Sequence, residues 1–164
     1  MADWVEFDPQ EILRRLTARE VDFVIVGGFA AVIHGSPRVT QDLDLTYAHD
    51  PENLEALGDV LTQIHSNLYG IEDEVPFVPD GRTLRQTEIL TLQTDFGKLD
   101  LLARPSGSPP YAEVKAAAKR VDINGLLVSV VSIPDLLAMK RAAGRPKDVA
   151  DVAELQAIER REKT

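Results

Sequence analysis

Two aspartates, Asp42 and Asp44, stand one residue apart in the segment "TQDLDLTYA", which has the alternating apolar pattern of a β-strand. Side chains at positions i and i+2 of a strand point to the same face of the sheet. The two carboxylates would then lie side by side, and one would tend to hold a proton unless a cation neutralised them. Mg²⁺ binds to one or two carboxylates together with substrate phosphates. We therefore interpret the pair as half of a metal site.

Two further features of the sequence fit this interpretation. Asp100, in "GKLDLL", lies in a second strand-like segment where Leu99 and Leu101 would face the opposite side. The pair Gly27-Gly28 follows a β-branched run, and thirteen residues separate it from Asp42. Backbone N–H groups at a helix N-terminus bind phosphate well, and glycine lets the phosphate approach. The sequence therefore predicts a third carboxylate and a phosphate-binding turn beside the pair.

Apolar spacing and turn residues predict an α/β fold with a mixed β-sheet flanked by helices and a C-terminal helical segment. We expect one domain over residues 1–164, with a core over about 20–131 and C-terminal helices over about 132–161. Residues 67–87 have no clear pattern, and we expect irregular structure there. The remaining segments divide into expected helices (9–20, 29–35, 51–67, 111–119, 132–144 and 145–163) and expected strands (22–26, 40–48, 87–93, 98–103 and a hairpin over 120–132 that turns at Asn124-Gly125).

Composition excludes several classes of protein. The chain has no cysteine, so it has neither disulfides nor thiolate metal sites, and its three histidines lack zinc-ligand spacing. The N-terminus has no signal-peptide pattern, and the longest uncharged apolar run, residues 23–33, is too short to cross a bilayer. We expect a cytoplasmic protein with no membrane contact.

The distribution of charge is uneven. The net charge of −9 argues against a generic nucleic-acid binder. However, residues 1–100 carry 7 Lys or Arg against 19 Asp or Glu, whereas residues 101–164 carry 11 against 8. The acidic part could hold cations and the basic part could meet phosphates, although mixed charge is also typical of any solvated surface.

The combined pattern resembles the nucleotidyltransferase superfamily related to DNA polymerase β. The longer segments "GGFAAVIHGSPRVTQDLDL", "GKLDLL" and "MKRAAGRPKDVADVAEL" resemble its small bacterial branch, which holds AbiEii-like and MenT-like toxins of toxin–antitoxin systems. The resemblance covers most of residues 22–155. It implies a nucleotidyltransferase-like core and a metal-dependent transfer of a nucleoside monophosphate from an NTP.

The resemblance also implies roles for individual residues. Gly27 and Gly28 would hold the triphosphate, and Asp42 and Asp44 would bind two Mg²⁺ ions. Asp100 would bind one of these ions and act as the base for the acceptor hydroxyl. Several toxin relatives carry a Gly-Ser turn, so the serine contact with nucleotide is absent from this Gly-Gly turn.

Four more residues are candidates for nucleotide binding. Relatives often place a late basic residue against the triphosphate, and Lys140 and Lys147, with Arg145 between them, offer this charge. The alternative is that they are solvated charges near helix ends. Arg38 and Thr40 would contact phosphate or hold the loop before Asp42. Asp148 and Asp151 are interpreted as acids at the start of a helix rather than as a further motif.

Three functions are consistent with these residues. The first is transfer of a nucleotide to a macromolecule, either the 3′ end of tRNA or a protein side chain, by the toxin of a pair with an antitoxin protein. The second is modification of a small molecule, as in the aminoglycoside nucleotidyltransferases of the superfamily. The third is a non-catalytic domain that binds nucleotide or a partner. We rank the macromolecular transferase first.

Overall fold

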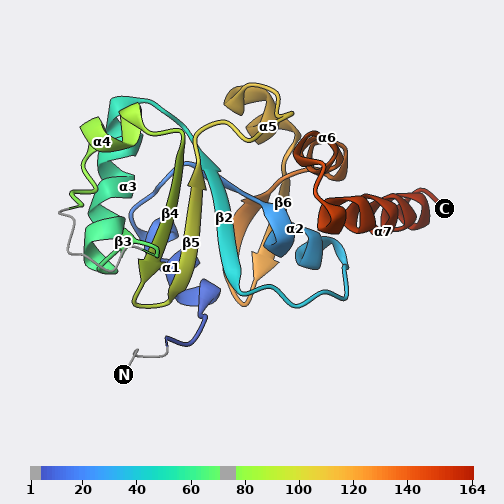
Figure 1. The fold of residues 1–164 in the computed structure, drawn as a ribbon, viewed down its shortest axis with the longest axis horizontal. Coiled ribbons are helices and arrows are strands. Elements are labelled where there is room, and N and C mark those ends of the chain that lie inside the picture. Colours follow the sequence, from blue (N-terminus) through green and yellow to red (C-terminus); the bar gives the residue numbers. More distant parts are fainter. Residues whose placement is uncertain (1–4, 71–76) are drawn as a thin grey trace.

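An open mixed sheet with helices on both sides forms the protein (Figure 1). This computed structural model describes residues 5–70 and 77–164. The helices are α1 (Pro9–Ala18), α2 (Gly27–His34), α3 (Pro51–Gln63), α4 (Gly81–Gln86), α5 (Tyr111–Ala117), α6 (Ile133–Ala143) and α7 (Pro146–Glu162). The strands are β1 (Phe23–Val26), β2 (Asp42–Tyr47), β3 (Asn67–Leu68), β4 (Ile89–Thr94), β5 (Gly97–Leu102), β6 (Lys119–Ile123) and β7 (Leu126–Val130).

The strands form one sheet in the order β3-β4-β5-β2-β1-β7-β6. Two neighbouring pairs are parallel, β2 with β5 and β1 with β7, and the other pairs are antiparallel. In the parallel pair at the centre, Asp44 lies opposite Asp100 and Leu45 lies opposite Leu101. The mixed sheet expected from the sequence is therefore confirmed.

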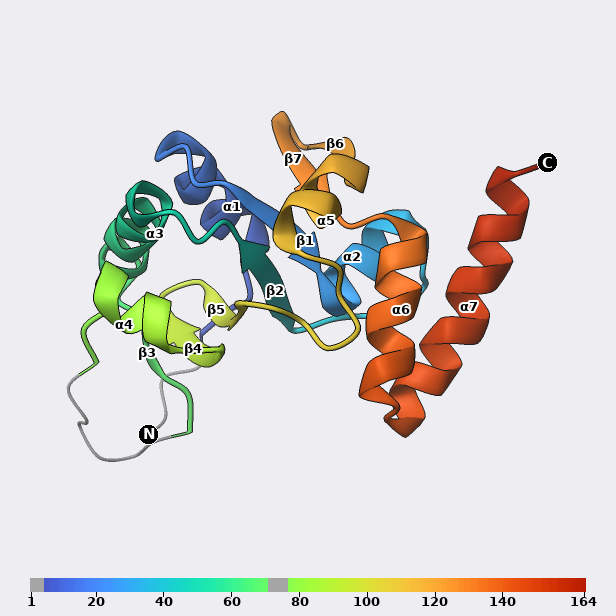
Figure 2. The same cartoon turned by 90° about the horizontal axis from the view of Figure 1, so that it is seen from above.

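Alternation of side chains along β2 and β5 separates the core from the opposite face. Leu43, Leu45, Leu99 and Leu101 are completely buried, whereas the aspartates between them are partly exposed. The leucines belong to the same core cluster as the apolar side chains of α1 and α3. These two helices lie on one side of the sheet, and α2, α6 and α7 pack against one another on the other (Figures 1 and 2).

The structure differs from the expected elements mainly over residues 67–87. There the chain forms the two-residue strand β3, which pairs with β4, and the short helix α4, which begins where Asp80 accepts a hydrogen bond from Thr83 N. Residues 71–76 of the expected irregular segment lie outside the described residues. The helix α2 begins at Gly27, two residues earlier than expected, so the glycines are its first turn. The division into core and C-terminal helices stays a prediction.

None of the described helices is both long and apolar enough to cross a membrane.

A buried asparagine joins the elements that carry the aspartates. Asn53, in the first turn of α3, accepts a hydrogen bond from Asp22 N at 2.7 Å through Oδ1. Its Nδ2 donates to Asp22 O at 3.0 Å and to Ala48 O at 2.8 Å. The residue before β1 and the residue after β2 are thereby held to the same helix end. These backbone groups would lose a buried partner without the amide side chain.

We expect Asn53→Ala to lower the free energy of unfolding by about 2 kcal/mol, because Asp22 N and Ala48 O lose their part-buried side-chain partner. Urea unfolding followed by circular dichroism measures the change. Glu52→Ala, at an exposed position of the same turn, is the matched control and should change stability by less than about 0.5 kcal/mol. Equal stabilities of the two variants would contradict the bridging role of Asn53.

Candidate active site

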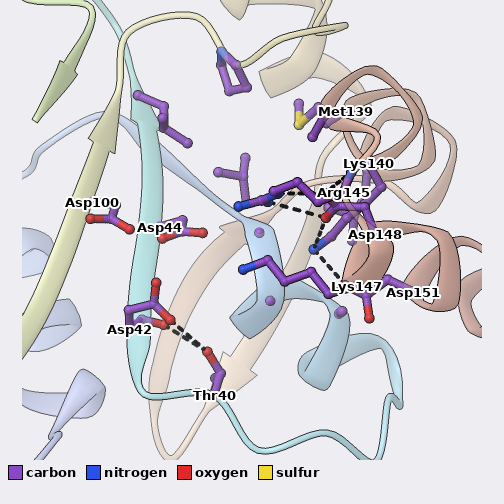
Figure 3. A pocket seen from close by; sticks show the side chains of 18 of the residues that line it. Thr40, Asp42, Asp44, Asp100, Met139, Lys140, Arg145, Lys147, Asp148 and Asp151 are labelled. Carbon is purple, nitrogen blue, oxygen red and sulfur yellow. Dashed lines mark hydrogen bonds and ion pairs between the residues drawn. The ribbon is translucent and has the colours of Figure 1, made fainter. Parts of the chain in front are cut away.

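A cavity of about 580 Å³ lies beside the carboxylate-bearing strands β2 and β5, between them and helices α6 and α7 (Figure 3). Every residue that the sequence analysis proposed for the site lines it: Gly27, Gly28, Arg38, Thr40, Asp42, Asp44, Asp100, Lys140 and Lys147. These residues come from five separate segments of the chain. The structure therefore brings all of the candidates together, while their chemical roles stay predictions.

The three aspartates form a compact carboxylate cluster. Asp42, Asp44 and Asp100 each offer one oxygen, and these three oxygens lie within 4.8 Å of one another. Oδ1 of Asp44 and Oδ1 of Asp100 are buried and have no hydrogen-bond partner among the described residues. Buried carboxylate oxygens without partners are costly, and an all-oxygen ligand set suits a hard divalent cation. The cluster therefore fits a divalent metal such as Mg²⁺.

The pKa values of the cluster also favour a bound cation. Burial, together with the negative charges of Asp42 and Asp100, raises the pKa of Asp44 to about 8. Burial also raises the pKa of Asp100 above its usual value. Carboxylates at this distance cannot all be ionised in a poorly solvated site without a compensating cation. A bound divalent metal ion would supply that charge.

Gly27 is required at the point where the backbone meets this cluster. Its φ is +71°, in the left-handed region, and a Cβ atom there would overlap Oδ2 of Asp44. The next residue, Gly28, is less constrained, because a Cβ atom there would lie 3.4 Å from Thr40 Oγ1. The first turn of α2 thus lies against Asp44 with its backbone exposed to the cavity. Phosphate oxygens would find N–H donors there.

Thr40 contacts the cluster from the loop before β2. Its Oγ1 lies 3.2 Å from both Oδ1 and the backbone carbonyl of Asp42, and it can donate to either oxygen. Figure 3 shows the contact with the carboxylate. Thr40 therefore orients Asp42. Of the two roles expected for Thr40, this contact favours holding the loop before Asp42 over contacting phosphate.

A second group of charges, on α6 and α7, is already paired. Lys140 is buried, and its Nζ lies 2.9 Å from Asp151 Oδ2 and 3.5 Å from Asp148 Oδ1. Arg145 donates to Asp148 at 2.7 Å, and Arg38 forms an ion pair with Asp151. Burial alone would raise the pKa of Asp148, but hydrogen bonds from Arg145 hold it below its usual value.

This pairing changes the interpretation of the two acids. Asp148 does stand in the first turn of α7 and accepts a hydrogen bond from Arg145 N. However, Asp148 and Asp151 are almost completely buried, and both contact Lys140 on the neighbouring helix. Their description as helix-start acids alone is therefore incomplete. Their spacing of three residues places them on one side of a helix, which was the available signal.

Lys147 is an exposed cation of the cavity wall, as is Arg104 on the loop after β5. Lys147 lies in the first turn of α7, its side chain extends toward the aspartates (Figure 3), and it has no ion pair within the described part of the chain. It is thus available to an anion. The loop Arg104–Ser106 also lines the cavity and was missed by the sequence analysis. Gly107 lets this loop pack on α6, because a Cβ atom there would lie too close to Ala138 O.

Comparison with known families identifies this arrangement. The family model described as nucleotidyl transferase AbiEii toxin, type IV toxin–antitoxin system, matches residues 11–163. The chain belongs to the AbiEii family. Its members are nucleotidyltransferases, so the enzyme class and the family resemblance expected from the sequence are confirmed. Among curated protein sequences, none matches this chain.

Solved structures of nucleotidyltransferases have the same fold. The lincosamide antibiotic adenylyltransferase LnuA, bound to lincomycin, is 16% identical with a TM-score of 0.62, over 93% of this chain and 99% of LnuA. An antigenic nucleotidyltransferase-like protein from Paracoccidioides brasiliensis is 20% identical with a TM-score of 0.56, over 90% and 72%. The antibiotic-resistance factor ANT(2″)-Ia is 16% identical with a TM-score of 0.53, over 94% and 90%. At these identities the likeness shows the fold alone.

The two glycines give a matched pair of variants. We expect Gly27→Ala to reduce both stability and Mg²⁺-dependent nucleotide binding, because the new methyl group meets Asp44 and the residue has a positive φ. Gly28→Ala should keep a melting temperature close to that of the wild type. Differential scanning fluorimetry with and without Mg²⁺ and ATP checks both. Equal effects of the two substitutions would mean that Asp44 does not press against Gly27.

A second prediction concerns pH. Asp44 holds a proton in the folded protein up to its pKa of about 8, but in the unfolded chain only up to the ordinary aspartate pKa of 3.8. Its contribution to stability is therefore lost as pH rises toward 8. Without divalent metal, the melting temperature of the wild type should fall relative to that of Asp44→Asn between pH 5 and pH 8. Mg²⁺ should stabilise the wild type more at pH 8 than at pH 6, and a constant difference would contradict the raised pKa.

Proposed function

We propose that this protein transfers a nucleoside monophosphate from an NTP to a macromolecule, either the 3′ end of a tRNA or a protein side chain. The observation that carries the proposal is the position of Asp44 and Asp100 opposite each other on parallel strands, directly beside the first turn of α2. This geometry supports a metal-bound triphosphate with an acceptor next to it. The cavity is large enough for a nucleotide.

Each residue has a defined role in the proposed reaction. The backbone at Gly27 and Gly28 binds phosphate oxygens, and Asp42, Asp44 and Asp100 hold Mg²⁺, with two ions expected. Mg²⁺ held there would supply electrostatic stabilisation of the attacking and leaving oxygens in an in-line displacement. The acceptor oxygen bonds to the α-phosphorus while its proton passes to Asp100 and pyrophosphate leaves.

The cations on the opposite wall would bind the rest of the triphosphate. Lys147 is exposed and extends toward the aspartates, so it is the strongest candidate. Lys140 contacts two aspartates and reaches the nucleotide only if phosphate competes with them. Arg38 shares Asp151 with Lys140 and remains partly exposed at the edge of the cavity. Positioning and electrostatic stabilisation are the main contributions of a protein to such a transfer.

The acceptor and the biological role rest on the family. The description of the AbiEii family as toxins of a type IV system supports a toxin role, an antitoxin protein as partner and a cytoplasmic location. The basic part of the chain, residues 101–164, supports a polyanionic acceptor. If the test below shows transfer to a small molecule instead, that acceptor replaces the macromolecular one.

A label-transfer assay tests the proposal. Each NTP labelled at the α-phosphate is incubated with the protein and Mg²⁺, and separately with total tRNA, an aminoglycoside and lincosamide panel, and bacterial lysate. We expect label on tRNA or on a protein. The label should be lost in Asp42→Asn and Asp44→Asn, and Asp100→Asn should lower kcat by about 10²–10⁴-fold, as for removal of a general base.

The control for these variants is Asp122→Asn, in β6 on the exposed β6–β7 hairpin, which should transfer label as the wild type does. Melting temperatures show whether each variant is folded. Transfer to an antibiotic alone would replace the macromolecular acceptor by a small molecule. Transfer that continues in Asp42→Asn and Asp44→Asn would contradict the assignment of the carboxylates.

A further inference from the structure

The side of the sheet that carries the aspartates continues beyond Asp100 for two more strands. In the register of the sheet, Thr91 of β4 lies opposite Asp100, and the N–H of Tyr69, just after β3, donates to Thr91 O. A line across the strands therefore runs from Asp44 through Asp100 and Thr91 to Tyr69. Adjacent strands lie about 4.8 Å apart, so Tyr69 is roughly 10 Å from Asp100.

Within the described residues, this side of β3, β4 and β5 is not covered by a helix. The strand positions that share the face of Asp100 alternate with buried leucines and are all intermediate or exposed. Ile89 is 63% exposed and the Tyr69 ring is 52% exposed. No described helix lies in front of β4 and β5 in Figure 1, since α1 and α3 lie behind the sheet. We call these positions the β3–β5 face, and its members besides Asp100 are Asn67, Tyr69, Ile89, Thr91, Gln93, Lys98 and Leu102.

The chemistry of the β3–β5 face is that of a stacking surface with a positive charge. Lys98 Nζ lies 4.8 Å from the centroid of the Tyr69 ring and also lines the cavity two residues before Asp100. Exposed aromatic rings next to basic side chains stack bases and bind the backbone of single-stranded nucleic acids. Ile89 and Leu102 lie opposite each other and add apolar surface beside this line.

The charge of the β3–β5 face favours an anionic acceptor over a cationic one. Lys98 is the one cationic side chain among the described positions of the β3–β5 face, and Asp100 is the one carboxylate. At these positions a polycationic antibiotic would meet a positive charge and only the carboxylate assigned to the metal. A polyanion would meet a cation and a ring, and the bases of a single strand are free to stack.

Resting on the proposed function, we propose that the β3–β5 face binds the single-stranded 3′ end of an RNA acceptor. A nucleobase stacks on Tyr69, a backbone phosphate contacts Lys98, and the chain then reaches Asp100 with its terminal ribose hydroxyl. The distance between Tyr69 and Asp100 is long enough for base and hydroxyl to be bound together. Tyr69 is therefore a positioning residue for the acceptor and has no part in binding the NTP.

Direct binding tests this assignment without catalysis. A fluorescein-labelled, single-stranded oligoribonucleotide with a free 3′ hydroxyl is titrated with protein, and anisotropy gives Kd. Tyr69→Ala should raise Kd by about tenfold, as expected for the loss of one base–aromatic stack, whereas Tyr69→Phe keeps the ring and should bind as the wild type does. Leu127→Ala, with a similarly exposed side chain on β7, is the matched control and should leave Kd unchanged.

Two further variants make the test independent of the tyrosine. Lys98→Gln should reduce the slope of log Kd against log salt by about 0.7, the value for one phosphate contact with a single strand. Ile89→Glu should weaken binding by adding a negative charge to the face. In the transfer assay, Tyr69→Ala should raise KM for the acceptor and leave KM for the NTP unchanged. Melting temperatures confirm that each variant is folded.

The outcomes distinguish this inference from the proposed function. If Tyr69→Ala and Ile89→Glu bind the oligoribonucleotide as the wild type does, the acceptor lies elsewhere, although nucleotide transfer can still be correct. The same conclusion follows if Tyr69→Ala instead impairs transfer to an aminoglycoside or to a protein. Failure of the wild type to bind NTP with Mg²⁺ would overturn the proposed function, and the anisotropy result would still show whether the face binds RNA.

Discussion

Repulsion among three carboxylates is the constraint on which this structure depends. Asp42, Asp44 and Asp100 share one face of the sheet, and Asp44 is held against the backbone of Gly27. Such an arrangement costs folding free energy unless a proton or a cation compensates it. The surrounding core keeps it in place, since the leucines that alternate with these aspartates are completely buried and fix both strands. Stability is thus partly given up for a preformed binding site.

Buried carboxylates are compensated differently on the two walls of the cavity, the helical wall (α6 and α7) and the sheet wall (β2 and β5). On the helical wall, Lys140 and Arg145 neutralise Asp148 and Asp151, so that charge is balanced within the chain. On the sheet wall the aspartates face one another and have no such partner among the described residues. The first arrangement is balanced within the chain, whereas the second needs a proton or a cation. Uncompensated negative charge among the described residues of the cavity is therefore on the sheet wall, and the Lys147 side chain extends toward it from α7.

Much of the site could be predicted from the sequence because it depends on local periodicity. The alternation in "DLDL" and "GKLDLL" places Asp42, Asp44 and Asp100 away from the core, and the Gly-Gly pair marks a turn. Other contacts depend on tertiary geometry. The pairing of Lys140 with Asp151 follows from the packing of α6 on α7, and β3 is too short to have a pattern of its own, so the position of Tyr69 could not be predicted. The bridging role of Asn53 could not be predicted for the same reason, since its partners are backbone groups of two other segments.

The uneven distribution of charge along the chain corresponds to the two walls of the cavity. The acidic first hundred residues supply the three carboxylates, and the more basic remainder supplies α6, α7 and their cations. The acidic sheet wall would hold a metal ion, and the cations of α6 and α7 would face the phosphates of a nucleotide bound beside it. The line from Asp100 to Tyr69 then leaves the cavity across the strands of the sheet. In the proposed reaction, the nucleotide would lie between the two walls and the acceptor would reach Asp100 along the sheet, as an in-line displacement requires.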